Sequence, residues 1–196
     1  MEPLDIVDTQ NETAQTNRKL NATVAITVAL LATFMGICKV KDDNINQSMQ
    51  QAQANRVDHW AFYQARNVRE EVAKATVVQL KLAAAGRPAA EQAAYQDAIQ
   101  QYENLAQDQE LKKAQAKAEA QNDQKAYDDA NFKDDQFDLS DALLAIALSL
   151  FAITALTQMW ALYAAALVPT AFGVLMGLAG LLGWPIHPGA LIALLS

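Results

Sequence analysis

The chain has 196 residues, of which 52% are hydrophobic and 19% are charged, and its formal net charge is −7. Its 15 basic and 22 acidic side chains all precede Ala142, so residues 142–196 carry no charged side chain. A soluble domain needs charged side chains in contact with water along its whole length, so this distribution argues against a soluble globule. The acidic balance argues against a nucleic-acid-binding protein. The single cysteine excludes an internal disulfide framework.

The first predicted element is a transmembrane helix at residues 20–38. This run, LNATVAITVALLATFMGIC, has no charged residue and is close to the roughly 20 residues that a helix needs to cross a bilayer. The acidic tail at residues 1–19 has no basic residue before Arg18, whereas a secretory signal begins with basic residues. We therefore expect this first span to remain uncleaved.

The segment at residues 39–138 is predicted to be an extramembrane helical hairpin. It is polar and rich in Ala and Gln, and its only glycine and only proline, Gly86 and Pro88, lie together near its middle. A break at 86–88 leaves two nearly equal arms, which is what an antiparallel hairpin needs to return to the same membrane surface.

The two arms carry an apolar stripe that is narrow and rich in alanine. Pairing the arms around the break places Val68 opposite Leu105 and Val72 near Tyr102. Two lone helices joined in this way bury too little apolar surface to form a stiff stalk, so we expect several copies to pack into a coiled-coil-like homo-oligomer. A flexible monomeric hairpin is the alternative.

Four acidic residues gather where the second arm approaches the membrane. In a ring of subunits they would concentrate cations near the bilayer, whereas the simpler interpretation is a solvated helix end partly neutralised by lysines. The expected pairing of the arms brings Lys39 beside the first of them. The four residues of this stalk base are Asp134, Asp135, Asp138 and Asp141.

Two further spans are predicted in the C-terminal block. Helices usually end before a proline, and a proline is well tolerated in a first turn, so Pro169 is the expected boundary between them. We therefore expect the second span at residues 139–165 and the third at residues 169–184. The remaining residues, 185–196, are too few to span and are expected to lie at the membrane interface.

Small and polar residues inside these spans indicate contacts between helices. Gly173, Gly177 and Gly180 place small residues on one face of the third span, which lets another helix approach closely. In the second span, Thr154 and Gln158 lie one turn apart, where they would line a neutral pore in an oligomer or hydrogen-bond to neighbouring helices.

The sequence contains no pattern of catalytic, cofactor-binding or metal-ligating residues. His59 and His187 lie far apart, Cys38 has no neighbouring base, and the glycines cluster in an apolar segment rather than in a phosphate-binding loop. We therefore expect a non-enzymatic protein with no cofactor. Lys and Arg residues near the spans are more frequent on the side of the hairpin, which predicts that the hairpin lies in the cytoplasm.

Two stretches of the chain resemble a known family. The first is VAITVALLATFMGICKVKDDNINQSMQQAQANRVDHWAFYQARNVRE, in which Trp60, Tyr63, Gln64 and Ala65 form a W-x-x-Y-Q-A run. The second, SLFAITALTQMWALYAAALVPTAFGVLMGLAGL, is similar to the ending of the same family. That family is the bacterial membrane-protein family known as domain of unknown function 4337. The resemblance implies an integral bacterial membrane protein and brings no activity, ligand or catalytic residue.

These features lead to three functional hypotheses. The first is a homo-oligomeric bacterial inner-membrane protein whose helical stalk serves as a scaffold or as a docking surface for a protein partner. The second is an oligomeric cation channel with a neutral pore and an acidic mouth. The third is an accessory subunit of a larger membrane complex.

Overall fold

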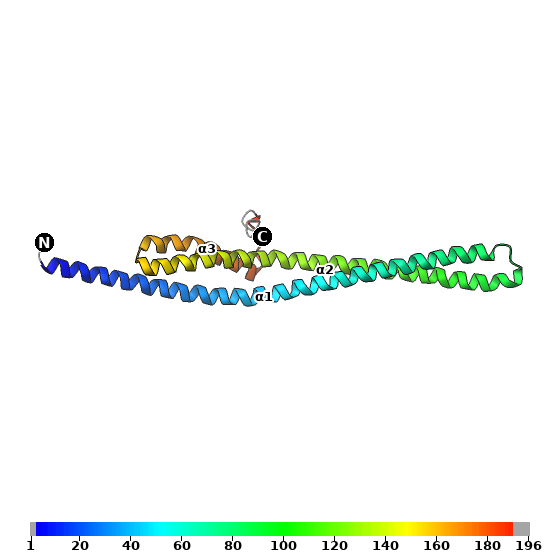
Figure 1. Cartoon of the computed structure of the whole chain (residues 1–196), viewed down its shortest axis with the longest axis horizontal. Helices are drawn as coiled ribbons and strands as arrows, with labels where there is room; N and C mark the ends of the chain where they lie inside the picture. The colour runs from blue at the N-terminus through cyan, green and yellow to red at the C-terminus, as the bar shows by residue number, and fades with distance from the viewer. Residues whose placement is uncertain (1–2, 190–196) are drawn as a thin grey trace. The chain divides into compact units, whose positions relative to one another are not determined.

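The computed structural model describes residues 3–189, and their side chains from Gln15 onward. Within this range the chain is all-helical: α1 is Pro3–Ala84, α2 is Ala89–Thr157 and α3 is Trp160–Leu182 (Figure 1). Each helix is long and apolar enough over part of its length to cross a membrane.

The helices contribute to two compact units. The insert unit is Ser48–Asp129, and the terminal unit comprises the described residues before and after it. Helix α3 belongs to the terminal unit alone, whereas α1 and α2 each contribute a segment to both units.

A tight turn joins α1 to α2 in the insert unit. Helix α1 ends at Ala84 and α2 begins at Ala89, on either side of Gly86 and Pro88. Gly86 has a φ of +84°, a left-handed conformation that costs glycine little because it has no Cβ. The backbone N–H of Arg87 donates to the carbonyl of Ala84 at 3.2 Å, which closes the last turn of α1.

The contact between α1 and α2 in the insert unit buries apolar side chains, among them Ala73, Val77, Ile99 and Ala120, together with polar partners. The carboxylate of Glu70, whose side chain is 1% exposed, lies 2.5 Å from Lys113 Nζ. Nearer the start of the unit, His59 Nδ1 lies 2.6 Å from Asp123 Oδ2. The later residue of α1 thus pairs with the earlier residue of α2, so the two helical segments run in opposite directions within the insert unit. Two further pairs across this polar seam are Lys81 with Glu103, at 2.7 Å, and Arg66 with Gln109, at 3.0 Å.

The pairing across the seam differs from the sequence-based expectation. Val68 and Leu105, which were expected to face one another, are 61% and 41% exposed. In the expected register Glu70 would face Glu103, a like charge, whereas it pairs with Lys113. The expectation was wrong because it matched apolar side chains and ignored the charges that are buried together at the seam.

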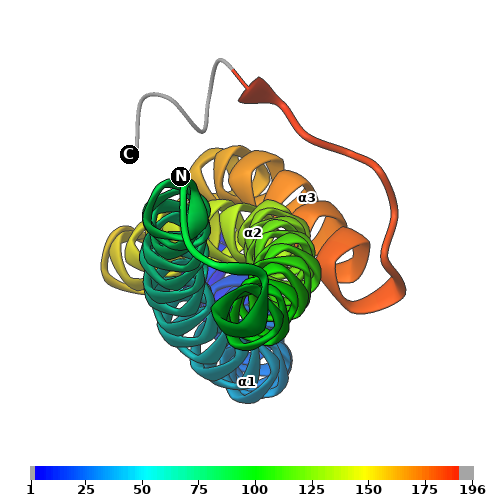
Figure 2. The same cartoon turned by 90° about the vertical axis from the view of Figure 1, so that its right-hand side faces the viewer.

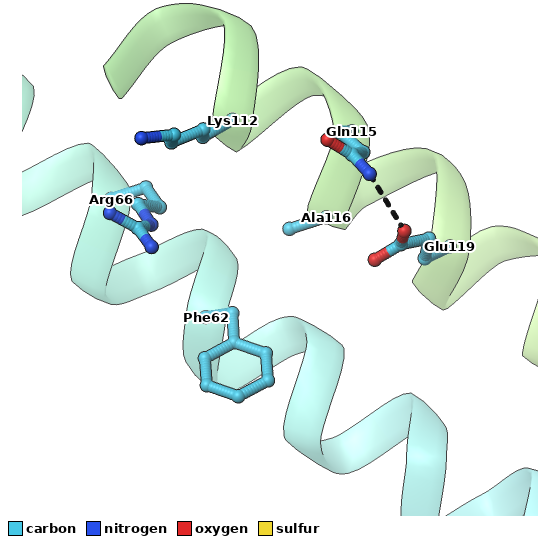
Figure 3. Close-up of a pocket in the computed structure, with 6 residues that line it drawn as sticks. All are labelled: Phe62, Arg66, Lys112, Gln115, Ala116 and Glu119. Carbon is cyan, nitrogen blue, oxygen red and sulfur yellow. Dashed lines mark hydrogen bonds between the residues drawn. The ribbon is translucent and has the colours of Figure 1, made fainter. Parts of the chain in front are cut away.

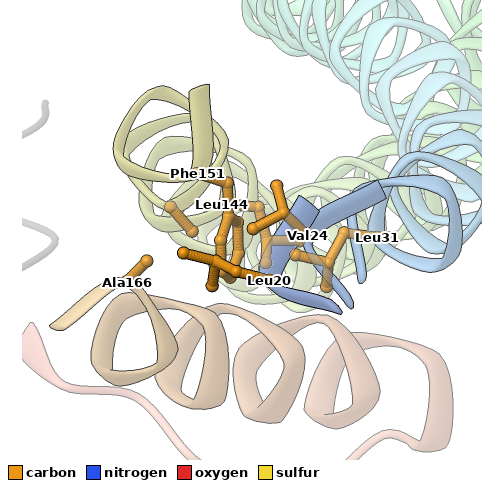
Figure 4. Packing of buried hydrophobic residues seen from close by; sticks show 7 residues of the cluster. Leu20, Val24, Leu31, Leu144, Phe151 and Ala166 are labelled. Atoms are coloured by element: carbon orange, nitrogen blue, oxygen red, sulfur yellow. The ribbon is translucent and has the colours of Figure 1, made fainter. Parts of the chain in front are cut away.

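In the terminal unit, α3 lies beside α2 (Figure 2). Segments of all three helices enclose an apolar core. The hydroxyl groups of Thr27 in α1 and Tyr163 in α3 lie 3.0 Å apart, so these two helices are also joined by a hydrogen bond. The buried core residues are Leu20, Val24 and Leu31 from α1, Leu144, Ala147 and Phe151 from α2, and Ala166 from α3 (Figure 4).

Three glycines of α3 lie where neighbouring side chains leave no room for a Cβ atom. Gly177 faces both other helices, and a Cβ built on it would lie 2.8 Å from Ser140 Oγ. The same hydroxyl group donates a 2.8 Å hydrogen bond to the carbonyl of Gly173. The nearest atoms to the built Cβ are Leu144 Cγ for Gly173, Phe34 Cζ for Gly177 and Phe137 Cζ for Gly180, at 2.7–2.8 Å.

The connection between α2 and α3 lies at Gln158 and Met159, and not at Pro169 as the sequence-based boundary had it. Gln158 has a φ of +60°, which lets the chain reverse, and Pro169 lies inside α3. Near this proline, the hydroxyl group of Thr170 donates to the carbonyl of Ala166 at 2.8 Å. The prediction relied on the preference of proline for the first turn of a helix. It placed the boundary wrongly because a helix that is packed against its neighbours tolerates an interior proline. The observed division gives α3 23 residues, close to the roughly 20 of a full span.

The buried side chain of Gln136 binds the backbone that follows α3. The side-chain amide of Gln136 donates to the carbonyl of Trp184 at 2.8 Å and to that of Ile186 at 2.7 Å. The segment expected at the interface, residues 185–196, is described only as far as Gly189, so its remainder lies outside the described residues. At the other terminus, residues 3–19 of the expected acidic tail belong to α1.

Large apolar side chains of the terminal unit point outward. Leu30 is 67% exposed, Leu156 is 84% exposed and Phe172 is 58% exposed. Polar side chains such as Ser140 and Thr154 are fully buried in the same unit. The terminal unit is therefore more apolar on its surface than a water-soluble helical bundle.

Candidate functional site

Carboxylate groups from two helices meet in the terminal unit. Asp42 on α1 is 2% exposed, and its Oδ2 accepts a 2.7 Å hydrogen bond from Lys39 Nζ. The amide of Asn46, one turn further on, donates to Asp42 Oδ1 at 3.3 Å and to Asp134 Oδ1 on α2 at 2.8 Å. We call Asp42, Asn46, Asp134 and Asp138 the carboxylate cluster.

The environment of the carboxylate cluster favours bound protons. Burial, followed by hydrogen bonding to Asp42 and the charge of Asp138, raises the pKa of Asp134 to about 6. Burial, followed by the charge of Asp42, also raises the pKa of Asp138. Close carboxylates disfavour simultaneous ionisation, so the cluster retains a proton at a pH where an isolated aspartate has lost it.

Two members of the predicted stalk base belong to this cluster and another does not. Asp134 and Asp138 take part in it, whereas Asp135 lies 3.1 Å from His187 Nε2 in the segment after α3. The ring of His187 stacks on that of Phe132, with 4.7 Å between the ring centroids. Asp135 therefore helps to hold the chain after α3 against α2.

Lys39, which was expected beside Asp134, forms ion pairs along its own helix. Lys39 pairs with Asp42 at 2.7 Å and Asp43 at 3.6 Å, both on its own helix. Sequence reasoning also missed Asp42 and Asn46. Their spacing from Lys39, three and seven residues, would have signalled that the three side chains share one face of a helix.

Among the described residues, no group of three His, Cys, Asp or Glu side chains is placed to hold a metal ion. At the carboxylate cluster the amide of Asn46 joins the two helices, because it donates to Asp42 on α1 and to Asp134 on α2.

The polar residues predicted in the second span have partners within the chain. Thr154 is fully buried, and its hydroxyl group donates to the carbonyl of Leu150 at 2.8 Å. The amide of Gln158 donates to Asn21 Oδ1 at 3.0 Å. A side chain buried inside one chain does not face a lumen between chains, so Thr154 does not favour the pore hypothesis.

A shallow groove of about 310 Å³ lies across the insert unit between Phe62 and Lys112 (Figure 3). Its charged side chains already have partners: Arg66 donates to Gln109, and Lys112 lies 2.8 Å from an aspartate on its own helix. Gln115 donates to Glu119 at 3.1 Å inside the groove. These partnered groups leave no set of converging donors or acceptors for a small ligand in this groove.

A long apolar surface is the other distinctive feature of the insert unit. It runs along one side of α1 from Val57 to Leu82. Val68 and Val72 at its centre are 61% and 60% exposed. We call this surface the outer stripe, and its exposed apolar members are Val57, Trp60, Ala61, Val68, Val72, Ala75, Val78 and Leu82. The exposed polar residues Gln64 and Glu71 lie on the same side of the helix.

Comparison with known proteins identifies the family. A family model described as a domain of unknown function, DUF4337, matches residues 20–183. The chain belongs to the DUF4337 family. The family resemblance noted in the sequence is therefore confirmed. No curated protein and no solved structure matches the chain. The DUF4337 match includes the first apolar run, the whole insert unit and α3, so it extends over the insert unit and much of the terminal unit.

Proposed function

We propose that this DUF4337 chain is a homo-oligomeric, multi-pass protein of the bacterial inner membrane, and that its insert unit is an antiparallel helical hairpin acting as a scaffold. The observation that carries the proposal is the exposure of large apolar side chains on the outside of the insert unit, where Val68 and Val72 are 61% and 60% exposed. An apolar surface of this length on a water-facing helix indicates a helical partner.

The outward apolar side chains of the terminal unit support insertion into lipid. Removing a leucine or phenylalanine side chain from water is worth about 1.5–3 kcal/mol, and Leu30, Leu156 and Phe172 would each lose that contribution in an aqueous setting. The glycine contacts of α3 are typical of close packing between membrane helices.

The proposed orientation follows from the basic residues near the apolar segments. Lys39 and Lys41 follow the first apolar run on the side of the insert unit, opposite Arg18 and Lys19, and Lys133 adds a further base near the second run. This excess favours a cytoplasmic insert unit. Trypsin added to inverted vesicles should cleave after Lys81, in the last turn of α1, whereas intact spheroplasts should protect this bond; the reverse pattern would reverse the orientation.

The proposal is tested by the mass of the full chain, extracted from membranes in a mild detergent and measured by native mass spectrometry. We expect two or more chains per particle, and a shift to the monomer when Val68→Glu and Val72→Glu place charges in the outer stripe. Leu111→Glu, at a residue of α2 that is 73% exposed, is the matched control and should leave the mass unchanged. A wild-type monomer at every concentration would remove the proposal.

A further inference from the structure

A groove lies between α1 and α2 in the terminal unit, apart from the contacts used so far. Its volume is about 310 Å³, and its described lining residues are apolar except for Asn21. Val24 and Phe151 are buried at its base, where they also belong to the apolar core (Figure 4). Ala25 and Ala152 are exposed, and their short side chains leave the groove open to the outside. We call this hollow the α1–α2 groove.

One end of the α1–α2 groove is polar. The amide of Gln158, just after α2, donates to Asn21 Oδ1 at 3.0 Å. Because Asn21 accepts through its oxygen, its amide nitrogen remains a donor, and this nitrogen makes no hydrogen bond to another described residue. The side chain of Asn21 is exposed, so the donor is accessible from outside the groove.

Arg18 adds a positive charge at the same end. It lies one turn before Asn21 and two turns before Ala25, and residues seven apart on an α-helix point within about 20° of one another. Arg18 is therefore on the groove side of α1, where its side chain is exposed and forms no ion pair with another described residue. Lys19, two positions before Asn21, points about 200° away from it and so faces away from the groove.

The polar end lies at the level expected for lipid headgroups. Arg18 precedes the first apolar run, and Trp160, which is 46% exposed, begins α3 beside the connection at Gln158. Tryptophan is enriched at the interface between membrane and water. From Asn21 to Val28 the groove follows α1 for about 10 Å, a third of the roughly 30 Å of hydrocarbon in a bilayer.

We infer that the α1–α2 groove binds an anionic phospholipid, with an acyl chain along the groove and the phosphate group at Arg18 and Asn21. A cation and an amide donor at the mouth of an apolar groove match the phosphate and the hydrocarbon of such a lipid. The inference rests on the membrane insertion proposed above and names a ligand of the terminal unit.

The competing occupant is a helix of a second copy. One turn of an α-helix, about 10 Å across and 5.4 Å long, fills about 400 Å³, which exceeds the volume of the groove. A single acyl chain is narrower than a helix and can follow the groove along its length.

Lipid titration of the full chain in a mild detergent tests the headgroup contact. Phosphatidylglycerol and phosphatidylcholine with identical acyl chains are added separately, and native mass spectrometry gives the affinity of each lipid per chain. We expect phosphatidylglycerol to bind about fivefold more tightly, because this is the contribution of one basic side chain near an anionic headgroup. Arg18→Gln should abolish the preference, whereas the matched control Lys19→Gln should retain it.

A second pair of variants tests the acyl chain. Ala152→Leu fills the α1–α2 groove and should weaken the binding of both lipids about tenfold. Ala145→Leu, two turns earlier on the same side of α2, is also exposed but does not line the groove, so it should leave both affinities unchanged. Arg18→Gln alters no packed contact and therefore remains a test if Ala152→Leu unfolds the chain.

The outcomes separate this inference from the proposed function. Equal affinities for the two lipids, or equal losses from Arg18→Gln and Lys19→Gln, would overturn the inference and leave the membrane protein standing. Fewer chains per particle in Ala152→Leu, with lipid binding unchanged, would assign the groove to a second copy and overturn it as well. A chain that stays in solution without detergent would remove both the lipid site and the proposed membrane insertion.

Discussion

At the scale of single residues, glycine contacts in α3 fix how closely the helices of the terminal unit approach. The missing side chain of Gly177 leaves space that Phe34 of α1 and Ser140 of α2 fill. Gly36, in the apolar run of α1, has no atom within 4 Å of a built Cβ. Both glycines lie in apolar helices, so the sequence alone does not separate the one that packs from the one that does not.

Replacing these two glycines by alanine should therefore have opposite effects. Gly177→Ala overpacks a contact at 2.7 Å and should lower the free energy of unfolding by about 1–3 kcal/mol. Gly36→Ala should raise it by about 0.5–1 kcal/mol, because alanine has the better helix propensity and meets no neighbour. Denaturant titration of the purified chain in detergent measures both. Equal effects of the two substitutions would contradict the packing described for α3.

At the scale of elements, the positions of charged residues predict much of the fold and little of its pairing. The apolar runs indicate three helices able to span a membrane, because a stretch of about 20 apolar residues without charge is typical of a membrane-spanning helix. The position of the α2–α3 connection was not predictable from Pro169, because local preference yields to packing. The carboxylate cluster was predictable only in part, since Asp134 stood out within an acidic run whereas Asp42 gained its role from a contact across helices.

The register of the insert unit should depend on the ion pair between Glu70 and Lys113. The hydrogen bonds from Lys113 and Lys74 hold the pKa of Glu70 below its usual range. The ionised Glu70 therefore contributes its full stabilisation at a pH above the ordinary pKa of a glutamate. This stabilisation is lost as the pH falls through the lowered pKa of the folded chain. Glu70→Gln should lower the thermal unfolding midpoint at pH 7 and have little effect in strong acid.

A double-mutant cycle of Glu70→Gln and Lys113→Gln isolates the interaction between the two residues. We expect the combined loss to be smaller than the sum of the single losses, because each single change leaves a partner at the seam uncompensated. Circular dichroism melting curves supply the measurement. Additive effects would mean that this pair does not set the register.

At the scale of the whole molecule, burial of carboxylates makes stability depend on pH in the direction opposite to that of Glu70. The folded chain raises the pKa of Asp134 to about 6, so between about pH 4 and pH 6 it binds more protons than the unfolded chain. The free energy of unfolding should accordingly fall as the pH rises through this range and then level off.

Asp134→Asn should remove most of this slope and raise the stability at pH 7 by on the order of 1–2 kcal/mol, because the amide carries no charge to desolvate. Asp43→Asn, at a side chain that is 60% exposed, is the control and should leave the slope in place. Unfolding followed by tryptophan fluorescence from pH 4 to pH 8 gives the comparison. A wild-type stability that increases across pH 4–6 would contradict the assignment.

The polar seam of the insert unit also has a kinetic consequence. Besides Val77 and Ile99 the seam buries mainly alanine, and its ion pairs and hydrogen bonds, such as those of Glu70 and His59, are readily replaced by bonds to water. Separating α1 from α2 there therefore exposes less apolar surface than opening a core of leucine and phenylalanine side chains. Transient opening should therefore be frequent, and backbone amides between residues 48 and 129 should exchange with deuterium sooner than those lining the apolar core around Leu144 and Phe151.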